Sequence, residues 1–149
     1  MKRNILKHFA LILLISVLLF QSNTLAQLSG TYTIPGTPYA TIEAAIADLN
    51  FQGVGSGGVT FNVAAGHIET FTSPIAGTIT ASGTETDQII FQKSGSGANP
   101  LITAALGGTG TTDGIIIITG GDYITFNKID RIQRNLIARI FNGNGLYQT

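Results

Sequence analysis

A three-residue pattern recurs along this chain: a β-branched residue, a phenylalanine and an amide residue. It occurs as Thr60-Phe61-Asn62, Ile90-Phe91-Gln92 and Thr125-Phe126-Asn127. Recurrence at unequal intervals is typical of a solenoid whose coils carry loops of different length. We therefore predict an all-β solenoid in which equivalent residues of successive coils stack, with the phenylalanines inside and the amides in a polar ladder. An antiparallel β-sandwich is the alternative.

Four segments are predicted to be strands between glycine-rich turns. Residues 59–63 and 123–127 alternate apolar and polar side chains, as half-buried strands do. Residues 89–92 and 115–118 are nearly continuous β-branched runs, which predicts strands covered on both faces. Glycine takes 19 of the 149 positions, and it is a residue that tight turns accept readily. These features favour an all-β chain.

One stretch, residues 41–50, has helical periodicity. Thr41 is a suitable N-cap, because its hydroxyl accepts a hydrogen bond from a free N–H of the first turn, and Glu43 suits the positive end of the helix dipole. Asn50 and Gly53 stand where the helix is expected to stop. So short a helix is stable only when its apolar stripe packs on other residues. The stripe consists of Ile42, Ala45, Ile46 and Leu49.

The N-terminus has the three parts of a secretory signal peptide, which we assign to residues 1–26. Three basic residues precede a 12-residue apolar run at positions 9–20, and Thr24 and Ala26 suit a cleavage site before Gln27. The run is shorter than the ~20 residues that a membrane-spanning helix needs. We therefore predict a secreted or cell-surface protein without a membrane span after cleavage. An uncleaved signal anchor is the alternative, and a lipid anchor is excluded because the chain has no cysteine.

Charge divides the rest of the chain into two segments. Residues 27–127 contain one lysine, Lys93, and seven acidic residues, so their net charge is −6. Binding to nucleic acid is excluded for this segment, since several Lys or Arg contacts are needed to neutralise phosphates. Residues 128–149 contain one lysine, three arginines and Asp130, a net charge of +3. This basic tail is either an amphipathic helix that caps the last coil or accidental sequence after a truncation or frameshift, and the abrupt change favours the second.

A longer pattern surrounds the predicted helix. Gly30-Thr31-Tyr32-Thr33-Ile34 precedes it, and Gly57-Gly58-Val59-Thr60-Phe61-Asn62-Val63 and Ala65-Gly66-His67-Ile68-Glu69 follow it. Together with the stretch Tyr39-Ala40-Thr41-Ile42-Glu43-Ala44-Ala45-Ile46-Ala47-Asp48-Leu49-Asn50, they resemble the N-terminal part of secreted pectin-lyase-like proteins, especially large surface proteins of the Bacteroidetes type. The resemblance covers residues 30–127, although the family has a tyrosine where this chain has His67. It implies a right-handed parallel β-helix of about four coils, with residues 41–50 capping the first.

Three motifs carry possible chemistry, and for each we favour a structural role. Residues 53–58 fit G-x-G-x-x-G, but the helix precedes the glycines instead of following them, so we expect a flexible turn. Residues 107–113 approach a calcium-binding repeat with the aspartate one position late, and we expect a turn there too. His67 and Glu69 share one face of an extended chain, as acid–base partners or metal ligands would. Without a third partner nearby, we expect a solvated corner.

No set of acidic residues suggests catalysis. Asp113 and Asp122 flank the expected strand at residues 115–118, about 13 Å apart at strand rise, too far for paired carboxylates. Asp87 is distant in sequence from both. We predict no catalytic, cofactor-binding or metal-binding residue. The expected function is a non-catalytic, exported surface or adhesive module, a fragment of a larger protein, that contacts polysaccharide or other surface proteins. The alternative is the N-terminal piece of a carbohydrate-active enzyme without its catalytic coils.

Overall fold

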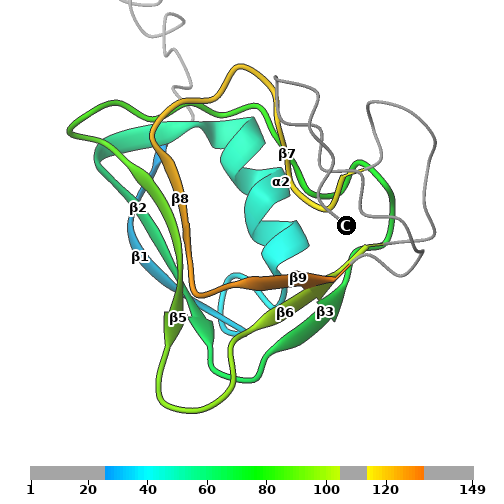
Figure 1. The fold of residues 1–149 in the computed structure, drawn as a ribbon. Helices are drawn as coiled ribbons and strands as arrows, with labels where there is room; N and C mark the ends of the chain where they lie inside the picture. Colours follow the sequence, from blue (N-terminus) through cyan, green and yellow to red (C-terminus); the bar gives the residue numbers. More distant parts are fainter. Residues whose placement is uncertain (1–25, 105–113, 133–149) are drawn as a thin grey trace, which may run out of the picture.

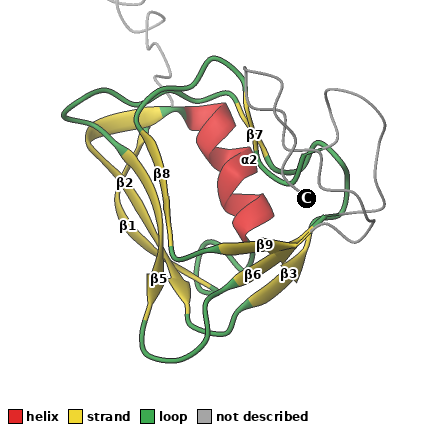
Figure 2. Cartoon of the chain, in the orientation of Figure 1, coloured by secondary structure: helices red, strands yellow, loops and turns green. Residues whose placement is uncertain are grey.

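The computed structural model describes residues 26–104 and 114–132 of the chain. The signal peptide predicted at residues 1–26 therefore lies outside the described residues, apart from Ala26, and so do residues 133–149 of the tail. One helix and nine strands form in this part of the chain (Figures 1 and 2). In chain order they are β1 (Leu28–Ile34), α2 (Ile42–Gln52), β2 (Val54–Ala64), β3 (Ile68–Thr70), β4 (Thr78–Ile79), β5 (Ile89–Ser94), β6 (Leu101–Thr103), β7 (Ile117–Ile118), β8 (Ile124–Asn127) and β9 (Asp130–Ile132).

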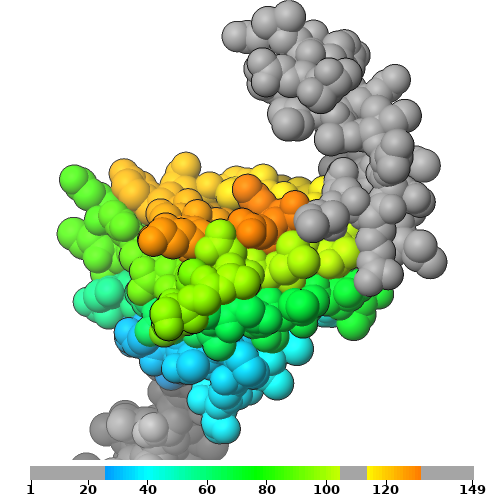
Figure 3. Space-filling model, turned by 60° about the horizontal axis from the view of Figure 1, so that its bottom comes forward, coloured from blue at the N-terminus to red at the C-terminus, as the bar shows by residue number. Residues whose placement is uncertain are grey.

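The strands form three sheets, and every strand pair in the described residues is parallel. Sheet A has the order β1-β2-β5-β8, sheet B the order β3-β6-β9, and sheet C pairs β4 with β7. From β2 onward the chain visits sheets A, B and C in turn and then returns to sheet A. Figure 1 shows the three sheets around α2, and Figure 3 shows successive layers from the blue and cyan residues to the orange ones. The antiparallel sandwich is wrong for these residues.

The recurring phenylalanines lie one above the other. Phe61 pairs in register with Phe91, and Phe91 with Phe126. Their rings stack with centroids 4.6 and 4.9 Å apart, within the range that aromatic pairs favour. Tyr32 extends the stack at the other end, with its ring centroid 5.8 Å from that of Phe61. The predicted stacking of the three phenylalanines is confirmed.

The predicted helix is also confirmed, and it extends two residues further than expected. Thr41 is the N-cap, and its hydroxyl accepts a hydrogen bond from Ala44 N–H at 3.1 Å. Gly53 ends the helix with a positive φ of 72°, a conformation that glycine adopts readily, and its N–H donates to Leu49 O at 2.8 Å. The four residues of the predicted stripe are no more than 1% exposed. The helix therefore buries its apolar face on the first layers of strands.

Polar side chains also fix α2 to the strands. Asn50 donates to Thr78 O at 2.7 Å and accepts from the N–H groups that follow β4. The Tyr39 hydroxyl donates to Asp48 Oδ2 at 2.5 Å, and Gln52 donates to the other oxygen of that carboxylate at 2.6 Å. Burial, reinforced by the hydrogen bond to Asp48, raises the pKa of Tyr39 above its usual value of 10.0. The helix is thus held by specific hydrogen bonds as well as by apolar contact.

The strand expected at residues 115–118 is shorter and less covered than predicted. Only Ile117 and Ile118 form a strand, and Ile118 is 48% exposed. Ile115 is buried, but its carbonyl passes so close to Gly77 that a Cβ at that position would lie 1.8 Å from the oxygen. Sheet C has two strands in the described residues, so the outer side of β7 has no strand against it there. Coverage of both faces is therefore wrong for this run.

The change in composition at residue 128 is not a break in the fold. β9 continues sheet B, with Asp130 opposite Leu101 and Arg131 opposite Ile102. The amphipathic helix considered for the tail, residues 128–149, is therefore wrong for residues 130–132, which form a strand. In the part of the chain that the structure describes, no helix is long and apolar enough to cross a lipid bilayer.

Candidate functional site

Glu69 and His67 do not form a solvated corner. Glu69 is 7% exposed and faces the N-terminus of α2. Its two carboxylate oxygens accept hydrogen bonds from Ile42 N–H at 2.7 Å and Glu43 N–H at 2.8 Å. His67 Nε2 lies 3.0 Å from Glu69 Oε2. Glu69 thus satisfies N–H groups that a helix leaves free in its first turn, and its negative charge suits that end of the helix dipole.

The sequence interpretation failed at Glu69 because the partners of the carboxylate belong to an earlier segment of the chain. Thr41 was expected to cap the helix, but one hydroxyl satisfies only one of the free N–H groups. The other N–H groups of the first turn still needed an acceptor, and this need was the one indication in the sequence that a second side chain must approach the helix. The Glu43 side chain also has a partner in the strands, because its carboxylate accepts hydrogen bonds from the backbone N–H and the hydroxyl of Thr72. These charged groups have structural partners.

The glycine-rich segment 53–58 was expected to be a flexible turn, but Gly53 ends α2 and residues 54–58 form a bulge at the start of β2. Val54 pairs with Leu28, whereas Val59 pairs with Gly30, so the register shifts between the two positions. A Cβ on Gly58 would lie 2.6 Å from Gln88 O, which only glycine avoids. The interpretation missed this role because the constraint comes from the backbone of the next layer.

Asp87 holds that bulge against the turn before β5. Its Oδ1 accepts from Gly57 N–H at 2.7 Å, and its Oδ2 accepts from the hydroxyls of Thr84 and Thr86 at 3.0 and 3.3 Å. These hydrogen bonds, the one from Gly57 first, hold the pKa of Asp87 below its usual value of 3.8. Asp87 therefore connects two layers.

The other candidate residues give no common site. Residues 107–113, including Asp113, lie outside the described residues. Asp122 is exposed, and its backbone N–H donates a hydrogen bond to the hydroxyl oxygen of Ser82 at 3.1 Å. Among the residues that the structure describes, no three His, Asp or Glu side chains gather as ligands of a metal ion.

A row of amide side chains runs across the outer face of sheet A. Asn62, Gln92 and Asn127 pair in register on the face opposite the buried phenylalanines. Gln92 Nε2 donates to Asn62 Oδ1 at 2.9 Å, so part of the predicted ladder is present. Asn127, at the end of this amide row, is exposed. Amides both donate and accept hydrogen bonds, so the row presents both kinds of group to a ligand.

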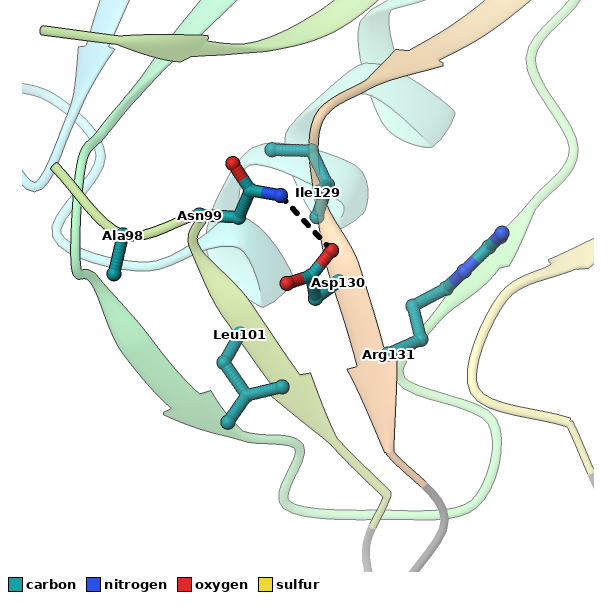
Figure 4. Close-up of a pocket in the computed structure, with 6 residues that line it drawn as sticks. All are labelled: Ala98, Asn99, Leu101, Ile129, Asp130 and Arg131. Carbon is teal, nitrogen blue, oxygen red and sulfur yellow. Dashed lines mark hydrogen bonds between the residues drawn. The ribbon is translucent and has the colours of Figure 1, made fainter. Parts of the chain in front are cut away.

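An open groove lies around the corner from the amide row, where sheet A passes into sheet B. Its volume is about 640 Å³. In Figure 4, Asn99 and Asp130 point toward one another, whereas Arg131 points away. Two residues separate Asn127 from Asp130, so the amide row and this corner groove adjoin. The groove is lined by Ala98, Asn99, Leu101, Ile129, Asp130 and Arg131.

A short chain of hydrogen bonds organises the groove. Asn99 Nδ2 donates to Asp130 Oδ1 at 3.1 Å, and Asn99 Oδ1 lies 3.4 Å from Lys93 Nζ, which also donates to Gly97 O. The only cation of residues 27–127 thus orients the amide that faces Asp130. The sequence interpretation missed Asn99 and Asp130 because each is an isolated polar residue in a separate turn or strand, and only the pairing of β6 with β9 brings them together.

The amide row and the corner groove form an extended polar surface. It offers acceptors at Asp130 and mixed donors and acceptors at the amides, with the apolar Leu101 and Ile129 between them. Such a surface fits a ligand that carries many hydroxyl groups along its length. No protein-family model, no curated protein and no solved structure matches this chain.

Proposed function

We propose that this chain is an exported, non-catalytic module of a right-handed parallel β-helix that contacts polysaccharide through the amide row and the corner groove. The single observation that carries the binding proposal is the amide row in register, continuing into a groove where Asn99 and Asp130 are hydrogen-bonded. Export rests on the signal-peptide pattern of residues 1–26. The module belongs, in this proposal, to a larger surface protein.

Two arguments support the β-helix assignment. The chain visits sheets A, B and C cyclically through parallel pairs, as the coils of a β-helix do. The sequence also resembles the N-terminal part of pectin-lyase-like proteins over residues 30–127. A continuous face made by repeated layers suits a polymeric ligand, because both present the same groups at regular intervals.

A polysaccharide fits this surface for chemical reasons. Sugar hydroxyls donate and accept hydrogen bonds, as do the amides of Asn62, Gln92 and Asn127. The partly exposed side chain of Leu101 can cover the C–H face of a sugar ring, whereas Ile129 is buried beneath the groove. Two pairs of these groups, Asn62 with Gln92 and Asn99 with Asp130, are held by hydrogen bonds between layers, so they lose little conformational entropy when a ligand binds.

The test is binding to immobilised polysaccharides. The full chain is expressed with its own N-terminus, the exported protein is purified, and mass spectrometry is expected to find Gln27 as its first residue. Retention is then measured on polygalacturonate and on a neutral β-glucan. We expect one of them to retain the protein, and Asn127→Ala or Asp130→Ala to weaken binding about five- to tenfold each, the loss expected for one hydrogen-bonding side chain.

The matched control is Glu85→Ala, an exposed acidic residue in the turn before β5. Its binding is expected to equal that of the unchanged protein. Retention on neither polymer, or an equal loss in the Glu85 variant, overturns the binding proposal. Release of reducing ends from either polymer contradicts the non-catalytic assignment, and a retained N-terminal segment contradicts cleavage after Ala26.

A further inference from the structure

The layers end in an apolar surface at β7, β8 and β9. These strands are the last in their sheets, and within the described residues no strand pairs with their outer edges. Phe126 packs on Phe91 and is partly buried, whereas Phe91 is 0% exposed. Ile124 is likewise half-buried beside the fully buried Ile89 with which it pairs. Figure 3 shows this orange end opposite the blue and cyan end. Apolar side chains and unpaired strand edges at the end of a stack are usually shielded from water by a capping segment.

A further layer of strands is a poor cover for this end. Arg131 takes the register position of Ile102, which is 0% exposed on the core side of sheet B. A strand laid over β9 would enclose the guanidinium as Ile102 is enclosed, and an unpaired charge taken out of water is costly. A charged residue facing inward is a known way to block strand addition. A cover that leaves the rim at Arg131 in water avoids this cost.

The sequence after β9 has the properties of such a cover. Its apolar positions repeat at the three- and four-residue intervals seen in the buried stripe of α2. A helix over residues 133–141 would be about 13 Å long at the usual rise, which is similar to the length of the 11-residue α2. The segment begins at Ile132, on the end that needs covering. The apolar positions are Leu136, Ile137, Ile140 and Phe141.

Charge supports the same assignment. Residues 27–127 carry a net charge of −6, and Asp122 is exposed just before β8. Residues 133–149 carry Arg134 and Arg139 and no acidic residue. On a helix, Arg139 falls off the apolar stripe and Arg134 falls at its border beside Phe141, so the long side chains of both can reach the rim while the stripe packs inward. Complementary charge favours this segment on the acidic stack.

We propose that residues 133–149 of this chain cover the open end of the layers, with the stripe around Ile137 and Ile140 packed on Ile124 and Phe126. The basic tail is then a second cap, opposite α2, and a second copy of the chain is not needed at this surface.

The test uses pairs of engineered cysteines, because the chain has none of its own. Ile124→Cys is combined in turn with Leu136→Cys, Ile137→Cys and Ile140→Cys in the full chain, and the exported protein is oxidised mildly. The control pair is Ile124→Cys with Ala138→Cys, which lies off the stripe. We expect a disulfide within one molecule for at least one stripe position, at a yield several times that of the Ala138 pair.

Two outcomes overturn the proposal. Disulfides formed only between molecules show that a second copy covers this end. No disulfide, or equal yields at all four tail positions, shows that the stripe does not pack there.

Hydrogen exchange provides a second measurement that needs no change in β8. The double variant Leu136→Asp/Ile140→Asp is expected to speed exchange of the β8 amides at least tenfold while leaving those of β2 unchanged. Ala138→Asp, with the same added charge type off the stripe, is expected to leave both strands as they are. Unchanged β8 exchange in the double variant contradicts the proposal.

Discussion

The two ends of the stacked layers differ in how completely their apolar side chains are covered. At the first layer, α2 buries its whole stripe, and Thr41 and Glu69 satisfy N–H groups of its first turn. At the last described layer, Ile124 and Phe126 pack on one neighbouring layer and stay partly exposed. Ile124 and Phe126 take the register positions of Ile89 and Phe91, which are 0% exposed, yet they are less buried. In a stack, a side chain is fully enclosed only when a layer or a cap lies on each side of it.

The largest expected effect compares two phenylalanines of the stack. Phe91→Ala removes a ring that is 0% exposed between two others, and it is expected to cost about 3–5 kcal/mol of unfolding free energy. Both substitutions are compared in the Leu136→Asp/Ile140→Asp background, in which the proposed cover is displaced. Phe126→Ala is expected to cost clearly less there, because its ring then contacts one stacked neighbour. Urea unfolding of both variants measures the difference. Equal losses would mean that Phe126 is as enclosed as Phe91, and the comparison of the two ends would fail.

A smaller effect is expected at the closed end. Glu69→Ala leaves two backbone N–H groups of α2 without their carboxylate, and it should cost about 2–3 kcal/mol, as for hydrogen bonds to a buried charge. Thr41→Ala removes one capping hydroxyl and should cost about 1 kcal/mol. Thermal unfolding measures both, with Glu85→Ala as an exposed control. A Glu69 variant as stable as the control would contradict the capping role.

The smallest expected effect is the pH dependence of the stability that Asp87 contributes between the two ends of the stack. The folded-state pKa of Asp87 is lower than the usual 3.8, so its contribution to stability is complete above the usual value and is lost as the pH falls through the lowered one. The stability difference between the unchanged protein and Asp87→Asn should therefore shrink as the pH is lowered below 3.8. Unfolding curves at a series of pH values measure it. A difference that grows toward low pH contradicts the assigned hydrogen bonds.

Much of the layer arrangement could be predicted from local patterns. The Phe-centred triplets indicated which residues stack, because each triplet carries its own alternation of buried and exposed positions. The apolar stripe of α2 could also be predicted, because helical spacing is a property of residues close together in the chain. The prediction for residues 115–118, a strand covered on both faces, was wrong, because a β-branched run shows only that an extended conformation is favourable. How much of it pairs depends on what lies beside it.

The sequence by itself determined the helix at Thr41, the register of the phenylalanines and the acidic charge of the layered region. The helix follows from consecutive residues, the register from the same short triplet repeated along the chain, and the charge from composition. Only the tertiary structure decided that Glu69 caps α2 and that Asn99 meets Asp130 in the corner groove. The reason is physical: the hydrogen-bond partner and the burial of a polar side chain depend on which layer lies next to it, and those layers come from distant parts of the chain.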